Sequence, residues 1–248
     1  MIKVLINGCN GKMGQVLANQ VFKNDNFDVY AGVDRIDTGD NKFPVFTSIQ
    51  DIKGKPDIII DFSIPVATMN ILEYAKQNQI PIVIATTGFS NEELQKIEDY
   101  SKEIPVFRSA NMSYEINLMA QMVAKMATLL TDSDIEIVET HHNRKVDAPS
   151  GTALLLANSI NEALDNKMTY EYDRHSKREK WSKTEIGIHA IRGGNVVGKH
   201  SVLFFSENEC FEITHTVDSR SVFADGALKA AEFLINKPAG LYNMRNMF

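Results

Sequence analysis

The sequence predicts an α/β protein in two parts: a doubly wound parallel sheet with helices on both faces, and a smaller α+β part with a mixed sheet. Three observations predict it. Over about the first 110 residues, short apolar runs rich in β-branched residues alternate with helical stretches. These runs are apolar throughout, as in strands whose two faces are both covered. In the second half, three strand-like runs follow one another without helices between them.

The elements of the first part follow in order along the chain. The capping box Ser90…Glu93 marks the start of one helix. The predicted strands are Ile2–Asn7, Phe27–Asp34, Asp57–Phe62, Pro81–Ala85 and Pro105–Arg108, and the predicted helices are Lys12–Lys23, Ala67–Gln79 and Asn91–Ser101.

The second part begins with a long helix over Ile116–Leu130 and ends before an amphipathic helix over about Val222–Ile235. We expect a dinucleotide-binding domain over residues 1–112 and 220–248, and a substrate-binding domain over residues 113–219. Between the two helices we predict strand Ile135–Glu139, polar loop Thr140–Pro149, helix Ser150–Leu164, charged surface loop Tyr172–Lys183 and strands Ile186–Arg192, Val196–Phe205 and Cys210–Val217.

Composition limits the classes of function. The formal net charge of −6 argues against nucleic acid as a partner, because phosphate binding needs a basic surface. No apolar run approaches the ~18–20 residues that span a bilayer, and Met1–Ile6 is typical of a first strand rather than of a signal peptide. Cys9 and Cys210 are far apart and form no disulfide framework. We therefore expect a cytoplasmic protein with no membrane partner.

A glycine-rich turn follows the first predicted strand and opens a helix. Its residues, Gly8-Cys9-Asn10-Gly11-Lys12-Met13-Gly14, have the spacing GxxGxxG rather than GxGxxG. Such glycines allow a tight turn and close approach to a pyrophosphate, and the helix N-terminus supplies N–H groups for phosphates. This indicates a Rossmann-like nucleotide site, although a glycine turn with a purely structural role remains the alternative.

The second predicted strand ends in an acid and a base. Asp34 stands twenty residues after Gly14, where an acid that binds the ribose of NADH is expected, and Arg35 can pair with the 2′-phosphate of NADPH, helped by Lys12. We hypothesise use of both NADH and NADPH, the alternative being solvated charges at a strand end. The loops after two later strands, Ala85–Gly88 and Ser109–Met112, can reach the nicotinamide end of the cofactor or can be ordinary turns.

The most informative segment runs from Glu139 to Thr152 and contains two histidines, an arginine, a lysine and a helix start. Histidine exchanges protons near neutral pH, lysine supplies positive charge, and Ser150-Gly151-Thr152 offers N–H groups and hydroxyls suited to a carboxylate. No convincing ligand set for a metal accompanies the histidine pair, and a solvated basic loop is the other alternative. His189, His200 and His215 read as structural, and Arg192-Gly193-Gly194 as a turn that can present a second anion contact.

At these positions the sequence resembles the dihydrodipicolinate reductase family, also called 4-hydroxy-tetrahydrodipicolinate reductase, nearly from end to end. The segment His141–Thr152, read His-His-Asn-Arg-Lys-Val-Asp-Ala-Pro-Ser-Gly-Thr, is the most specific part of the resemblance. The glycine-rich turn also fits, as do Asp61-Phe62-Ser63, Thr86-Thr87-Gly88-Phe89, Ala110-Asn111-Met112-Ser113, Ala224-Asp225-Gly226-Ala227 and Gly240-Leu241-Tyr242.

The resemblance implies a role for each matching residue. His141 is implied as the proton donor, with Lys145 as its acidic partner at the reacting ring. The implied substrate contacts are His142, Lys145, Gly151 and Thr152, the last two on a carboxylate. The implied shell of NADH or NADPH comprises Gly8, Cys9, Asn10, Gly11, Lys12, Met13, Asp34, Arg35, Ala85, Thr86, Thr87, Ser109, Ala110, Asn111 and Met112.

The resemblance further implies reduction of a cyclic unsaturated imine dicarboxylate to tetrahydrodipicolinate, with loss of water, in lysine and diaminopimelate biosynthesis. It implies a homotetramer assembled through the substrate domains. One departure is Glu115, where many members have glycine; in the first turn of a helix it favours the helix dipole but puts rate and substrate scope in question. The competing functions are another nicotinamide dehydrogenase and a nucleotide sensor without turnover.

Overall fold

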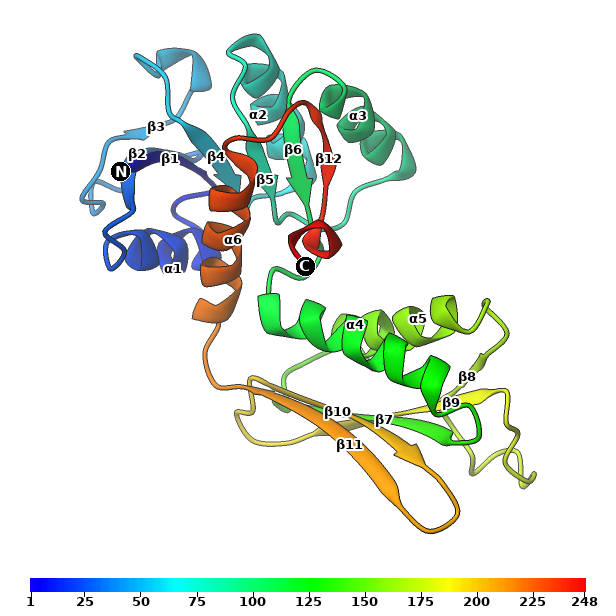
Figure 1. Ribbon diagram of the computed structural model, residues 1–248. Coiled ribbons are helices and arrows are strands. Elements are labelled where there is room, and N and C mark those ends of the chain that lie inside the picture. Colours follow the sequence, from blue (N-terminus) through cyan, green and yellow to red (C-terminus); the bar gives the residue numbers. More distant parts are fainter. The chain divides into compact units, whose positions relative to one another are not determined.

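The structure is a computed structural model that describes residues 1–248 (Figure 1). The chain forms two compact units. One comprises Met1–Tyr114 and Arg220–Phe248, so the C-terminal segment belongs to the same unit as the N-terminus; the other comprises Glu115–Ser219.

The first unit contains a seven-stranded sheet in which every pairing is parallel, in the order β12-β6-β5-β4-β1-β2-β3. This confirms the predicted doubly wound parallel sheet. Its strands are β1 (Ile2–Asn7), β2 (Phe27–Val33), β3 (Val45–Phe46), β4 (Ile58–Asp61), β5 (Ile82–Ile84), β6 (Pro105–Arg108) and β12 (Gly240–Tyr242). The carboxyl ends of β1, β4 and β5 meet at one edge of the sheet, where ligands of such folds bind.

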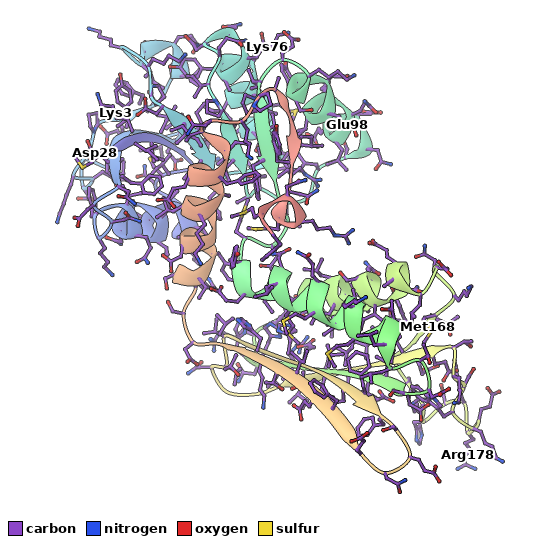
Figure 2. The ribbon with its side chains drawn as sticks, in the orientation of Figure 1. Lys3, Asp28, Lys76, Glu98, Met168 and Arg178 are labelled. Atoms are coloured by element: carbon purple, nitrogen blue, oxygen red, sulfur yellow. The ribbon has the colours of Figure 1, made fainter.

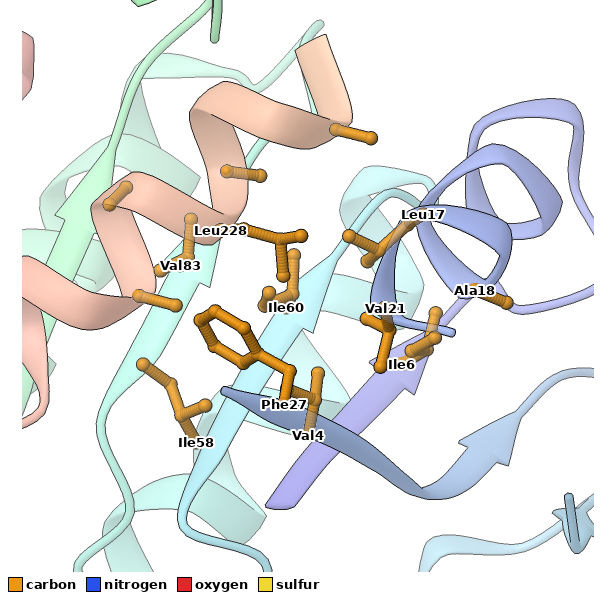
Figure 3. Packing of buried hydrophobic residues seen from close by; sticks show 14 of the residues in the cluster. Val4, Ile6, Leu17, Ala18, Val21, Phe27, Ile58, Ile60, Val83 and Leu228 are labelled. Carbon is orange, nitrogen blue, oxygen red and sulfur yellow. The ribbon is translucent and has the colours of Figure 1, made fainter. Parts of the chain in front are cut away.

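Alternate residues of the buried strands pack against opposite helical layers. In β1, Val4 and Ile6 join the core beneath α1 (Lys12–Val21) and α6 (Ser221–Leu234), whereas Leu5 joins the other core. Figure 3 shows this first core, with Leu17 and Leu228 closing over the sheet. The second face is covered by α2 (Pro65–Gln77) and α3 (Asn91–Ser101). Both faces are therefore apolar, which explains strands without an alternating pattern.

The second unit contains a mixed five-stranded sheet in the order β11-β10-β7-β9-β8, which confirms the predicted mixed sheet. β10 pairs antiparallel with β7 and β11, whereas β7–β9 and β8–β9 are parallel. Helices α4 (Tyr114–Leu129) and α5 (Gly151–Ala163) share one core with this sheet. The strands are β7 (Asp134–His141), β8 (Thr169–Glu171), β9 (Glu185–Arg192), β10 (Gly198–Phe205) and β11 (Cys210–Val217).

Some elements differ from the sequence prediction. The short strands β3, β8 and β12 and the 3₁₀ turns η1 (Ile49–Asp51) and η2 (Met244–Met247) were not predicted, because two to four residues are too few for a periodic pattern. β7 extends to His141, so Thr140 and His141 lie in a strand and not in the polar loop. β10 begins at Gly198 instead of Val196.

Figure 2 shows the charged side chains of Lys76 and Glu98 at the surface of the first unit, whereas the carboxyl groups of Asp61 and Glu139 are buried. In the second unit the charged loop between β8 and β9 carries Arg178, which is exposed. None of the helices has the length and apolar character required to cross a bilayer.

Candidate active site

The glycine-rich turn of the first unit is built by close backbone contacts. Gly8 has φ +81°, and a Cβ there would lie 2.7 Å from the carbonyl oxygen of Phe62. A Cβ on Gly14 would lie 2.1 Å from the carbonyl oxygen of Gly8, too close for any side chain. The turn therefore requires glycine at both positions, so that the start of α1 packs directly on it.

The N-terminus of α1 is open. Its N-cap is Gly11, which has no side chain to accept from the first N–H groups, and no acidic residue lies in the first turn. These N–H groups have no acceptor inside the helix and carry partial positive charge. The glycine-rich turn has no side chains at Gly8, Gly11 and Gly14, and we call this open backbone surface the glycine cradle. The glycine cradle and the uncapped helix end both fit the pyrophosphate of a dinucleotide.

Asp34 is fixed beside this turn. Its two carboxylate oxygens accept from the backbone N–H groups of Asn10 and Arg35, both at 2.8 Å. The Asn10 side chain in turn donates to the carbonyl oxygen of Ile36 and accepts from the amide of Asn41 at 2.8 Å. Asp34, the acid expected to bind the ribose, is thus hydrogen bonded to the glycine-rich turn, and Arg35 is exposed next to it.

Asp61, at the end of β4, is a buried hub that the sequence reasoning did not assign. Its carboxylate accepts from Asn7 at 2.8 Å, Thr68 at 2.6 Å and Thr86 at 2.8 Å, and from Ser63. Burial raises the pKa of Asp61, although these four hydrogen bonds oppose the rise. An acid that closes an otherwise apolar strand was the available signal, since buried charges need partners.

The hub determines what Thr86 can do. Its hydroxyl donates to Asp61 and also accepts from the Ser63 N–H at 2.9 Å, so both functions are satisfied inside the protein. Thr86 is 4% exposed, whereas Thr87 is exposed and Ala85 partly buried. In this loop the Thr87 side chain can therefore contact a ligand. The Thr86 side chain instead holds the loop to Asp61 and Ser63.

The loop after β6 is held by its own side chains. The Ser109 hydroxyl donates to the carbonyl oxygen of Asn111 at 2.7 Å, and the Asn111 side chain accepts from the Ser113 N–H at 2.9 Å. Met112 is 2% exposed and belongs to the core, and a Cβ on Gly226 of α6 would lie 1.7 Å from its carbonyl oxygen. The loop is thus fixed, and its partly buried Ser109 and exposed Ala110 face outward.

In the second unit, His141 ends β7 and is 8% exposed. Its Nδ1 lies 2.6 Å from Oε2 of Glu139, and its Nε2 makes no hydrogen bond within the chain. A Cβ on Gly198 would lie 3.2 Å from Nε2, so the glycine leaves this nitrogen uncovered by a side chain. The ring can therefore exchange a proton through Nε2 while Nδ1 is held.

Helix α5 starts beside this histidine. Ser150 is its N-cap, and the hydroxyl accepts from the Ala153 N–H at 3.2 Å. Gly151 is exposed with no atom within 4 Å of where a Cβ would be, and no acid lies in the first turn. Gly151 and Thr152 thus open a helix whose electrostatics suit a carboxylate.

The loop between β7 and α5 carries the cationic residue. The Lys145 ammonium lies 2.8 Å from Asp147, and the hydrogen bond from Lys145 lowers the pKa of Asp147. The same loop is anchored to the turn after β9, because the His142 N–H donates to Val196 and the Gly193 N–H to His141. The structure thus brings His141, His142, Lys145, Gly151 and Thr152 into one unit around the start of α5.

Arg192 and His200 belong to the same cluster. The Arg192 guanidinium donates to both oxygens of Glu139, at 2.7 and 2.8 Å, and to the carbonyl oxygen of Asp147. The expectation that this turn presents an anion contact is therefore wrong for its arginine. His200 Nε2 lies 3.0 Å from the Ser150 hydroxyl, and burial, with nearby His141, lowers the pKa of His200 to about 4. His200 is therefore uncharged at neutral pH, and its structural role stays a prediction.

No three or more His, Cys, Asp or Glu side chains are arranged to hold a metal ion. Within the histidine pair, Nδ1 of His141 faces Glu139, and the backbone N–H of His142 donates to the carbonyl oxygen of Val196.

Comparison with known proteins places the chain. Residues 2–112 match the family description "Dihydrodipicolinate reductase, N-terminus" and residues 115–248 match "Dihydrodipicolinate reductase, C-terminus". A 4-hydroxy-tetrahydrodipicolinate reductase of Caldanaerobacter subterraneus subsp. tengcongensis is 51% identical over 100% of this chain and 98% of its own length. One from Clostridium tetani is 47% identical over 98% and 96%. A dipicolinate-bound dihydrodipicolinate reductase from Paenisporosarcina sp. TG-14 has TM-score 0.82 at 29% identity, covering 100% of both chains. The two-part fold, the glycine cradle and the histidine-bearing strand end are thus found in a chain that belongs to the dihydrodipicolinate reductase family.

Proposed function

We propose that the chain reduces 4-hydroxy-tetrahydrodipicolinate (dihydrodipicolinate) to tetrahydrodipicolinate with NADH or NADPH, in the lysine and diaminopimelate pathway of the cytoplasm. Family membership along the whole chain supports the reaction. The observation that carries the chemistry is His141: one ring nitrogen is held by a buried carboxylate, and the other makes no hydrogen bond within the chain.

The first unit holds the coenzyme in this proposal. The backbone from Gly8 to Met13 and the open end of α1 bind the pyrophosphate, and Asp34 accepts from the ribose hydroxyls. Arg35 is available for a 2′-phosphate, and Ala85, Thr86, Thr87 and the Ser109–Met112 loop surround the nicotinamide end. The reduced coenzyme, when bound, supplies a hydride.

The second unit binds and protonates the substrate. Gly151 and Thr152 at the start of α5 bind one carboxylate, and His142 and Lys145 provide further contacts to the dianion. Loss of the ring hydroxyl as water first leaves a C=C bond conjugated with the imine, and the hydride then adds to one carbon of that bond. The C=C electron pair then takes a proton at the neighbouring carbon from Nε2 of His141, while Lys145 stabilises the negative charge that develops. Two hydrogens are added in total, and the imine is retained.

The direct test follows NADH and NADPH absorbance while aldol condensation of pyruvate with aspartate semialdehyde generates the substrate. We expect rapid oxidation that depends on the protein. His141→Gln and Lys145→Met should each lower kcat by about 10²–10⁴-fold, the range for loss of a general acid. His175→Gln, in an exposed loop, is the matched control and should keep wild-type turnover. Full turnover by His141→Gln would refute the proton donor, and no oxidation by the wild type would refute the reaction.

We also propose a homotetramer assembled through residues 113–219, which the family relationship supports. Native mass spectrometry of the purified chain should give four times the 27.8 kDa chain mass. A monomer at micromolar concentration would contradict it.

A further inference from the structure

One acid in the second unit contacts the proposed proton donor but takes no step of its own in the reaction proposed above. Glu139 is 0% exposed, lies on β7 two residues before His141, and is separated from solvent on every side. An ionised carboxylate in such a place is costly unless its oxygens are fully hydrogen bonded. The hydrogen-bond partners of Glu139 therefore explain how its charge is stabilised and which groups it orients.

The two oxygens of Glu139 divide four donors between them. Oε2 faces Nδ1 of His141 at 2.6 Å and accepts from Arg192 Nη1 at 2.8 Å. Oε1 accepts from Arg192 Nη2 at 2.7 Å and from the Ser150 N–H at 3.0 Å. The carboxylate thus joins the histidine at the end of β7, the arginine at the end of β9 and the N-cap of α5.

The charge state follows from these contacts. Burial disfavours ionisation, but hydrogen bonds from Arg192, His141 and the Ser150 N–H outweigh it and hold the pKa of Glu139 below its usual value. An ionised carboxylate can only accept, so Nδ1 of His141 must carry a hydrogen. Nε2 is then the nitrogen that gains and loses the proton.

We propose that Glu139, clamped by Arg192, is a positioning residue that fixes the tautomer of His141 and its place relative to the start of α5. The inference rests on the proposed function, in which His141 protonates the substrate and α5 binds its carboxylate. When Nε2 of the imidazolium gives its proton to the substrate carbon, the neutral ring left behind has its hydrogen on Nδ1, bound to Glu139. The carboxylate therefore stabilises the tautomer formed by the reaction and keeps both anchoring points of the substrate in one rigid frame.

The second unit provides a matched control for this acid. Glu136 lies on the same strand, but its side chain points to the opposite face of the sheet. There it lies 2.6 Å from His189 Nε2 and 3.3 Å from Arg174 Nη2, so it also joins a histidine and an arginine. Glu136→Gln removes a carboxylate with similar partners away from His141, and size-exclusion chromatography verifies that the assembly is kept.

The kinetic test is a double-mutant cycle. Glu139→Gln should lower kcat by about 10²-fold with a smaller change in KM, since general acid catalysis is worth about 10²–10⁴, and Glu136→Gln should leave kcat unchanged. In the His141→Gln background, Glu139→Gln should lower kcat by less than about 2-fold, because residues that act as one unit are not additive. Equal losses in both backgrounds would overturn the inference. If His141→Gln itself keeps full turnover, the proposed function fails instead.

A second measurement needs no turnover. In ¹⁵N-histidine-labelled wild-type protein at about pH 9, where imidazoles are neutral, long-range ¹H–¹⁵N spectra should show the His141 ring as the Nδ1–H tautomer, assigned by its absence in His141→Gln. Glu139→Asp, whose carboxylate is one methylene shorter, should keep the charge and part of the tautomer preference. An Nε2–H tautomer in the wild type would overturn the inference.

Discussion

We expect Gly14→Ala to lower both the stability of the protein and its affinity for the coenzyme, because the glycine cradle has no room for a side chain at this position. The added Cβ would lie 2.1 Å from the carbonyl oxygen of Gly8, and 2.8 Å from Cα of Cys9. Both neighbours are backbone atoms, so the clash cannot be relieved by rotation of a side chain. The helix start must move by about 1 Å to restore normal contact, and overpacking of this kind costs about 1–3 kcal/mol or more.

The displacement should reduce both stability and coenzyme affinity. For a chain of this size a loss of about 2–3 kcal/mol lowers Tm by roughly 5–10 °C. Because α1 also carries the N–H groups aimed at the pyrophosphate, the Kd for NADH, measured by quenching of protein fluorescence, should rise at least about tenfold. Both readouts come from the same purified variant.

Gly11→Ala separates the two effects. Its Cβ would lie 3.2 Å from the carbonyl oxygen of Gly8, a contact that a shift of a few tenths of an ångström relieves, and its φ of −69° suits any residue. This variant should melt within about 2 °C of the wild type, yet bind NADH more weakly, since the methyl group enters the phosphate cradle. A Gly14→Ala protein with wild-type Tm and Kd would refute the steric argument, and wild-type affinity in Gly11→Ala would refute the placement of the pyrophosphate.

Three further predictions follow. Asp61→Ala should cost at least about 2–4 kcal/mol in urea unfolding, because it leaves buried donors without an acceptor. Asp61→Asn should be tolerated better, and because burial raises the pKa of Asp61 in the folded chain, wild-type stability should fall relative to Asp61→Asn as pH rises above about 4; a gap independent of pH would contradict this. Arg35→Ala should lower kcat/KM for NADPH more than for NADH, and dual use itself fails if the wild type prefers one coenzyme by about a thousandfold or more. Ser90→Ala should cost about 1 kcal/mol, since the Ser90 hydroxyl accepts from the Glu93 N–H; no change in the urea midpoint would count against the cap.

The accuracy of the sequence prediction varied with the physical signal. Long buried strands and amphipathic helices were predicted because periodicity reflects burial of whole faces, and the helix at Ser90 begins where its capping box indicated. β12 was missed because three residues show no period, although it pairs with β6 at the edge of the sheet. Arg192 was misassigned because its partner, Glu139, lies 53 residues away in sequence and meets it only through the β7–β9 pairing. Long-range pairing of buried charges leaves no local pattern.

Two buried acids illustrate how similar carboxylates acquire different tasks. Asp61 is surrounded by neutral hydroxyl and amide donors, so burial prevails and its pKa rises. Glu139 has the guanidinium of Arg192 against both oxygens, so its pKa falls despite complete burial. A carboxyl group that need not be charged can fix loops at a sheet edge, and Asp61 does so for Ser63 and Thr86. Orientation of a proton donor requires a carboxylate that stays ionised while the histidine cycles between charge states. The arginine is therefore what makes the second acid suitable for that role, and Arg192→Leu should impair turnover through Glu139 even though Arg192 belongs to neither proposed binding site.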